Sequence, residues 1–223
     1  MAGLNHALAL NKSLDQRARE RFTSSMRAWV LTDLAGQMQA DYNQANEASG
    51  THHDSGEAVH QFLKDRGLFK WYSSMRCATQ ELVWQSVLRA VESDPVSVAQ
   101  IGEPEAPRHG GSLTLDSAIS LPDSVDKMDV HLMPGNYQGG HSDGAEAGVI
   151  YDNGLDVFSF GMMGENLDDI GHSMANFTRL KWPDLDPSLI VDVGCTIGHN
   201  TLPWKQAFPD AEVHGLDAAA PCL

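Results

Sequence analysis

Two acidic residues and a glycine-rich turn lie close together near the end of the 223-residue chain. Asp192 precedes the turn Gly194-Cys195-Thr196-Ile197-Gly198, and Asp217 follows about twenty positions later. Glycines let the backbone turn sharply and let a ligand approach it closely, and the start of a helix offers free N–H groups. An acid at the end of the following strand can accept hydrogen bonds from both hydroxyls of a ribose. These residue types at this spacing therefore predict a binding site for a nucleoside ligand.

The surrounding sequence predicts the elements that position this turn. Residues 189–193 are apolar except for one acid and indicate a strand, a helix is expected at about 200–208, and residues 212–217 indicate a second strand. A strand, a glycine-rich turn, a helix and a strand in this order are typical of nucleotide-binding α/β units. The dinucleotide fingerprint Gly-x-Gly-x-x-Gly is not met, because Thr196 and His199 stand at its second and third glycine positions.

The sequence IVDVGCTIGHNT resembles the first motif of the class I S-adenosylmethionine-dependent methyltransferases, and FPDAEVHGLD resembles the helix end and second strand that follow it. The resemblance covers residues 165–223 and departs from the family at Thr196, where the family has its middle glycine. It implies an α/β fold in which a helical N-terminal module is followed by the start of an incomplete Rossmann-like domain.

The resemblance also implies that S-adenosyl-L-methionine is the cofactor. In this family the glycine turn wraps the methionine part of the cofactor, the first acid helps to place its amino group, and the second acid binds the ribose hydroxyls. The implied cofactor-binding residues are Asp192, Gly194, Cys195, Thr196, Gly198, Asp217 and, near the adenine, Ala218. A thiol at a helix start can be reactive, but the family often has a packed Cys at this place, so we expect a structural role for Cys195.

The implied activity is methyl transfer to an O, N, C or S atom of a small-molecule acceptor. A sheet of this family has seven strands, whereas only residues 218–223 follow Asp217, so we expect a partial version of a longer enzyme that is inactive alone. No pattern identifies the catalytic base, for which the candidates are His131, His141, His172 and His199. The alternative is a non-catalytic remnant whose N-terminal helices bind a partner or form a homodimer.

The rest of the chain divides into a helical module over residues 1–93 and a meandering connection over residues 94–164. Helices are predicted over 13–46, 57–66 and 68–92, and a helix near 165–180 opens the third part, residues 165–223. A short hairpin is predicted over 148–160, turning at Asp152-Asn153-Gly154. Apolar residues recur every four positions in the first helix and share one face of the last: Phe22, Met26, Val30, Leu34, Met38 and Tyr42, then Leu167, Ile170, Met174 and Phe177.

Two weaker patterns have competing interpretations. His141, Asp143 and His172 have the composition of a non-haem iron site, but ligand types alone do not make a site, and we expect no metal. Four aromatic residues at helical spacing would line a substrate pocket or, as we expect, the core: Phe69, Trp71, Tyr72 and Trp84.

The charge distribution limits the partners. The formal net charge is −15, and residues 1–93 hold ten basic and ten acidic side chains, so the whole excess lies in residues 94–223. Such a surface repels phosphate backbones and anionic membranes, so neither nucleic acid nor a membrane is expected as a partner. The three cysteines are too scattered for a disulfide framework, and no secretory signal is evident, which favours the cytoplasm.

Overall fold

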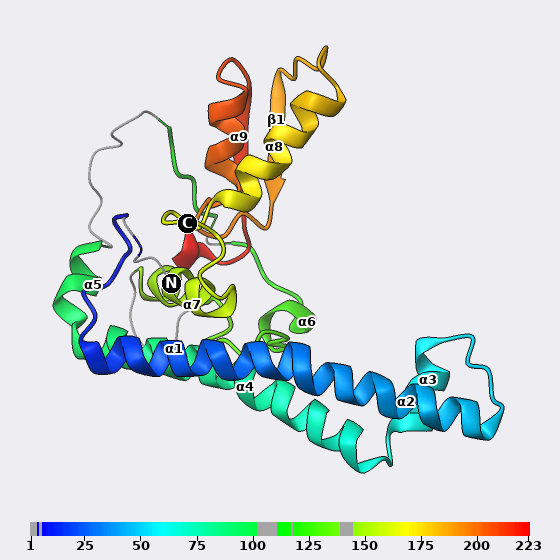
Figure 1. The fold of residues 1–223 in the computed structure, drawn as a ribbon. Helices are drawn as coiled ribbons and strands as arrows, with labels where there is room; N and C mark the ends of the chain where they lie inside the picture. The colour runs from blue at the N-terminus through cyan, green and yellow to red at the C-terminus, as the bar shows by residue number, and fades with distance from the viewer. Residues whose placement is uncertain (1–3, 5, 102–110, 117, 139–144) are drawn as a thin grey trace.

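The computed structural model describes residues 4, 6–101, 111–116, 118–138 and 145–223 (Figure 1). The helical part contains α1 (Leu14–Trp29), the π-helical turn η1 (Val30–Leu34), α2 (Ala35–Ser49), α3 (Gly56–Leu63), α4 (Gly67–Ser93), α5 (Pro95–Ile101), α6 (Asp123–Asp126) and α7 (Glu146–Phe158). The α/β part contains α8 (Asp169–Lys181), β1 (Leu189–Val193), α9 (Thr201–Ala207), β2 (Glu212–Leu216) and the 3-10 turn η2 (Ala220–Cys222). This combination of helices with a parallel sheet agrees with the predicted α/β class.

The first long helix is confirmed, because α1, η1 and α2 follow one another without a break. It begins with a capping box in which the Gln16 backbone N–H donates to the Ser13 hydroxyl and the Ser13 N–H donates to the Gln16 side chain. It ends where Gly50 takes a left-handed conformation with φ of 64°.

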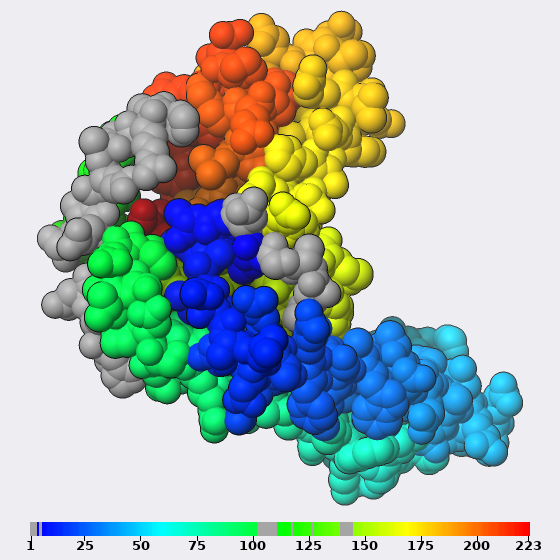
Figure 2. Space-filling model, turned by 60° about the vertical axis from the view of Figure 1, so that its left-hand side comes forward, coloured from blue at the N-terminus to red at the C-terminus, as the bar shows by residue number. Residues whose placement is uncertain are grey.

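The predicted helices over 57–66 and 68–92 are confirmed as α3 and α4. Helix α4 runs back along α1, and the far ends of α2 and α4 project with α3 as an arm, which the space-filling view also shows (Figures 1 and 2). None of the helices in the described ranges combines the length and the apolar run that crossing a bilayer requires.

The main core lies between α4 and α7. Val83, Trp84 and Val87 of α4 pack with Val149 and Val157 of α7, and all five are buried. Met133, Ala219 and Cys222 belong to the same cluster. The core therefore joins residues from all three segments into which the sequence divides.

The hairpin predicted over 148–160 is wrong, because this segment forms the buried helix α7. Its apparent turn residues serve helix packing instead. A Cβ atom on Gly154 would lie 2.4 Å from Cζ3 of Trp84, so the glycine lets α7 approach α4 closely. The Asn153 amide NH2 donates to the carbonyls of Val149 and Leu8, each at 3.0 Å, which pairs the donor group of this buried side chain.

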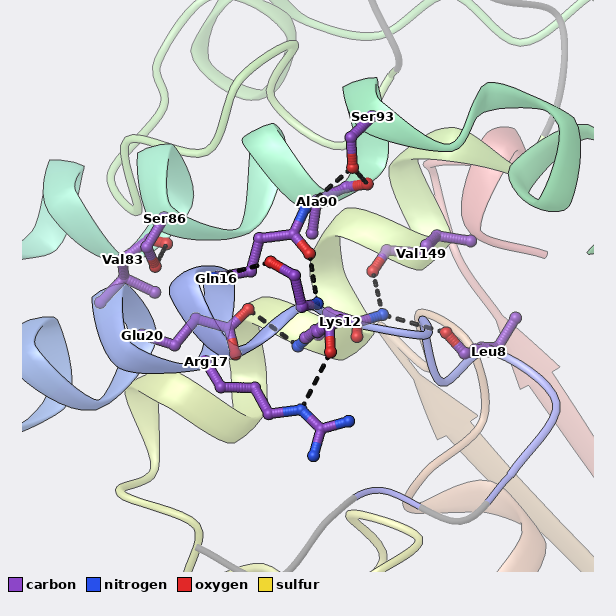
Figure 3. A network of polar contacts seen from close by, with 12 residues as sticks. Leu8, Lys12, Gln16, Arg17, Glu20, Val83, Ser86, Ala90, Ser93 and Val149 are labelled. Atoms are coloured by element: carbon purple, nitrogen blue, oxygen red, sulfur yellow. Dashed lines mark hydrogen bonds and ion pairs between the residues drawn. The ribbon is translucent and has the colours of Figure 1, made fainter.

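Polar contacts attach the segment before α1 to α1 and α7, and attach the first turn of α1 to α4 (Figure 3). Nζ of Lys12 lies 2.8 Å from the buried carboxylate of Glu20. The backbone carbonyl of Lys12 accepts a hydrogen bond from Nε of Arg17 at 3.1 Å. The Gln16 side chain donates to the Ser93 hydroxyl at 2.8 Å. Together with the bond from Asn153 to Leu8, these contacts fix residues 8–16 against the helical core.

Strands β1 and β2 are parallel neighbours, with Leu189 opposite Glu212 and Val193 opposite Leu216. Helix α9 covers the face that carries Asp192 and Gly215, since a Cβ on Gly215 would lie 3.6 Å from Cγ2 of Thr201. The alternate residues face away from α9, and Val193 remains 80% exposed there. One face of this sheet is therefore largely uncovered by the described residues.

The predicted helix near 165–180 is confirmed as α8, which begins after Leu167, and Leu167 itself is buried. Ile170, Met174 and Phe177 are each at least half exposed. Helix α8 instead packs against α9 with its small residues, because a Cβ on Gly171 would lie 2.8 Å from Cγ of Pro203. Within α8 the buried residues are thus the small Gly171 and Ala175, while the apolar residues Ile170, Met174 and Phe177 stay exposed.

Candidate functional site

The turn after β1 contains three residues in the left-handed backbone region. The φ angles are 80° at Gly194, 47° at Thr196 and 89° at Gly198. The backbone N–H groups of Gly194 and Cys195 donate to the carbonyl of Leu216 at 2.7 and 3.2 Å. The turn is therefore attached to the end of β2, and the positive φ values show why glycines stand at two of these positions.

Asp217 directly follows β2 and binds the turn. Its Oδ2 accepts from the Thr196 backbone N–H at 2.7 Å, and its Oδ1 accepts from the Ala219 N–H at 2.8 Å. The structure thus brings together the turn and the second acid, as the sequence predicts. Each carboxylate oxygen has two lone pairs, so both oxygens can accept a further hydrogen bond from a ligand hydroxyl. Ala218 lies beside this carboxylate and is exposed.

Asp192 connects the end of β1 to the start of α9. Its Oδ2 accepts from the Thr201 hydroxyl at 2.6 Å, and its Oδ1 accepts from the Asn200 amide at 3.4 Å. The first acid of the motif therefore holds the helix that follows the turn. Its predicted contact with a cofactor amino group stays a prediction.

Cys195 is buried beneath the turn, and burial raises the pKa of its thiol, with further contributions from Asp217 and Asp192. A thiol with a raised pKa is neutral and poorly nucleophilic. A Cβ on Gly215 would lie 2.9 Å from the Cys195 sulfur, so the glycine makes room for it. These observations support the structural role expected for Cys195.

Residues far from the motif complete this region, and the sequence analysis missed them. The Gln138 amide donates to the carbonyl of Ala218 at 3.4 Å. The ring of Tyr151 stacks on His199 with centroids 6.2 Å apart, and the ring of Tyr137 lies 5.7 Å from Tyr151. No local spacing relates these side chains to the turn, because α7 and the segment before it reach the turn only through the tertiary fold.

Helix α4 holds the segment that carries Gln138. Nε1 of Trp84 and Nε2 of Gln80 both donate to the carbonyl of His131, at 2.6 and 2.9 Å. The Tyr137 hydroxyl is 2.7 Å from Nδ1 of His131. The long helix α4 thus positions a segment that contacts the chain beside Asp217.

The phenols of this region are protonated at neutral pH. Burial raises the pKa of both Tyr137 and Tyr151, and in Tyr151 a hydrogen bond with Thr196 opposes part of that effect. Burial likewise raises the pKa of the Cys222 thiol to about 12. The phenol and thiol groups from outside the motif that lie near the turn are therefore neutral.

Among the four candidate histidines, His199 has a buried carboxylate partner. Its Nε2 lies 2.9 Å from Oδ1 of Asp152, a residue with 0% exposure in α7, and Nε2 of His6 lies 3.5 Å from the same oxygen. His131 is exposed, and His172 pairs with Asp168 at 3.4 Å on α8.

His141 and Asp143, two of the three residues with the composition of an iron site, lie outside the described residues. His172 is the third. Within the described ranges, no group of three or more His, Cys, Asp or Glu side chains is placed to hold a metal ion.

The four aromatic residues of α4 do not form one cluster. Trp84 is buried in the main core, as expected. Trp71 is 47% exposed and meets Trp29 edge to face with ring centroids 5.8 Å apart. Phe69 and Tyr72 are half-buried in the same first turns of α4. These three residues belong to the arm, so the interpretation as core holds for Trp84.

Comparisons with known proteins provide no assignment for this site: no protein-family model, curated protein or solved structure matches the chain. The geometry around the turn is therefore the basis of the functional argument.

Proposed function

We propose that this chain binds S-adenosyl-L-methionine at the turn 194–198 and Asp217, and that the protein is a methyltransferase acting on a small-molecule acceptor. The observation that carries the proposal is the hydrogen bond from the Thr196 N–H to the Asp217 carboxylate, which joins the ends of two adjacent parallel strands. Ligands of open α/β sheets bind at the carboxyl ends of the strands.

The donor and acceptor groups of this chain fit such a ligand. Asp217 keeps two acceptor positions for the two ribose hydroxyls, and the left-handed turn exposes backbone for close approach. Thr196 and His199 stand where the dinucleotide fingerprint has its second and third glycines, which argues against a diphosphate and fits a cofactor that has none. When bound, the cofactor would supply a methyl group activated by its sulfonium.

The contribution of the protein to this reaction is mainly positioning. Methyl transfer needs the acceptor atom in line with the bond that breaks, so a fixed cofactor and an oriented acceptor provide most of the acceleration. The contacts of Asp192 with Thr201 and of Asp217 with Thr196 keep the turn rigid for this purpose.

Binding of S-adenosylhomocysteine to the whole chain, measured by isothermal titration calorimetry, tests the proposal. We expect saturable binding that Asp217→Asn weakens about tenfold or more, because an amide keeps a single acceptor oxygen for two hydroxyls. Asp210→Asn, an exposed acid just before β2, is the matched control and should leave the affinity unchanged. The absence of binding to the folded wild-type chain, or equal affinity in Asp217→Asn, would contradict the proposal.

A further inference from the structure

His199 follows the last glycine of the turn directly, and its side chain is buried between the turn and α7. The side chain is 16% exposed, one face stacks on Tyr151, and Nε2 points at a carboxylate that is completely inaccessible. An imidazole in this place is fixed in orientation by three different parts of the fold: the turn, α7 and, through His6, the amino-terminal segment.

The contact with Asp152 determines what the other ring nitrogen can do. A carboxylate only accepts hydrogen bonds, so Nε2 of His199 carries the proton. In the neutral ring Nδ1 then has a free lone pair and is an acceptor. Nδ1 is buried and has no hydrogen-bond partner among the described residues. A buried acceptor without a partner costs stability, which indicates that a donor outside these residues completes the site.

The charges around the turn indicate which donor it is. Asp152, Asp192 and Asp217 place three carboxyl groups at or next to the turn, and no lysine or arginine forms an ion pair with them in the described part of the chain. A cationic donor is favoured in such surroundings. An ammonium group has three N–H donors, so Nδ1 of His199 and the remaining lone pairs of Asp192 can accept from the same group.

We infer that Nδ1 of His199, oriented by Asp152, accepts a hydrogen bond from the ammonium group at the amino-acid end of the cofactor. This inference rests on the proposed function. It makes His199 a binding residue for the amino-acid end of the ligand and Asp152 a positioning residue that acts through it. The adenosine end, held at Asp217, is not in contact with this pair.

Two ligands that differ only at the amino-acid end distinguish whether His199 binds that end or only supports the turn. S-adenosylhomocysteine contains the amino-acid group, whereas 5′-methylthioadenosine has the adenosine and the sulfur but lacks it. We expect His199→Phe, which preserves the stacking on Tyr151 but has no acceptor, to weaken S-adenosylhomocysteine binding about tenfold, the loss of one charge-assisted hydrogen bond. Binding of 5′-methylthioadenosine should remain within about twofold of the wild type, since its contacts are untouched.

Two further variants keep the inference falsifiable if His199→Phe does not fold. His199→Asn places an amide oxygen near the position of Nδ1 and should restore most of the affinity for S-adenosylhomocysteine. Asp152→Asn, which keeps the shape but offers a weaker acceptor to Nε2, should give an intermediate loss for this ligand alone.

The outcomes are distinct. If the wild-type chain binds neither ligand, the proposed function and this inference both fail. If the wild-type chain binds both, an unchanged affinity of the folded His199 variants for S-adenosylhomocysteine overturns this inference alone. An equal loss for the two ligands also overturns it, because it would show that His199 only supports the turn.

Discussion

At the scale of single residues, Thr196 is the most unusual feature of the site. A β-branched residue with φ of 47° is an outlier, since left-handed backbone costs an ordinary residue about 1–2 kcal/mol. Besides the hydrogen bond of Thr196 with Tyr151, its N–H donates to Asp217, and its hydroxyl donates to the carbonyl of Cys195 at 2.8 Å. A residue other than glycine thus adopts a conformation that favours glycine.

Substitutions at Thr196 should separate these two effects. Thr196→Gly loses the hydroxyl bond but relieves the backbone cost, so we expect its free energy of unfolding to stay within about 1 kcal/mol of the wild type. Thr196→Val keeps the backbone cost and loses the bond, so we expect it to be about 1 kcal/mol or more less stable than the wild type. Urea unfolding of the three proteins measures this, and a valine variant as stable as the glycine variant would refute the explanation.

Residues of the site were predictable from sequence only where they are close along the chain. Asp192, Gly194, Gly198 and Asp217 belong to one strand–turn–helix–strand unit, so their spacing alone places them together. Asp152 lies 47 positions from His199, and Gln138 lies 80 positions from Ala218. These contacts depend on how α7 packs between α4 and η2, which no local pattern specifies.

At the scale of elements, the same limit explains the errors. Asp-Asn-Gly is a strong turn signal in isolation, but in α7 the glycine fits against Trp84 and the asparagine NH2 donates to the carbonyls of Val149 and Leu8. In α8 the apolar residues that share one face correctly indicated a helix, and the small Gly171 made the close contact with α9. Periodicity therefore identified α8 but not α7, and small residues made the close contacts of both helices.

Glycine-to-alanine substitutions test this packing argument. In α7, Gly154→Ala would place a Cβ 2.4 Å from the Trp84 ring, and we expect it to lower the free energy of unfolding by about 1–3 kcal/mol despite its better helix propensity. In α2, the Cβ added by Gly36→Ala has no atom within 4 Å. This variant should raise the free energy of unfolding by about 0.5–1 kcal/mol. Chemical denaturation of both variants is the measurement, and a stabilising Gly154→Ala would show that α7 does not approach α4 so closely.

At the scale of the whole molecule, the amino-terminal segment, α1 and α7 meet around one lysine. Lys12 pairs with Glu20 of α1 and also lowers the pKa of Asp156 of α7. Burial nevertheless raises the pKa of both acids above their ordinary values, and it is the largest cause in each case. Two buried carboxyl groups thus share a single nearby lysine where these three parts join.

This arrangement predicts a pH dependence of stability. An acid whose pKa is raised on folding binds its proton more tightly in the folded than in the unfolded chain. Its contribution to stability is therefore greatest at low pH and is lost as the pH rises from the ordinary value of 3.8 for Asp156 through the raised one. Asp156→Asn cannot ionise, so its stability relative to the wild type should increase over this range and then level off.

Urea unfolding of the wild type and Asp156→Asn between about pH 4 and pH 8 measures the difference, because this interval begins near the ordinary pKa of an aspartate. Asp186→Asn, at an exposed position between α8 and β1, is the matched control and should show no such trend. A difference that decreases with rising pH would mean that the Asp156 carboxylate is stabilised in its ionised form, and Lys12 would then compensate both acids. An increasing difference would show that ionisation of Asp156 weakens the contacts between the amino-terminal segment and α7. Helix α7 also carries Asp152, which contacts His199.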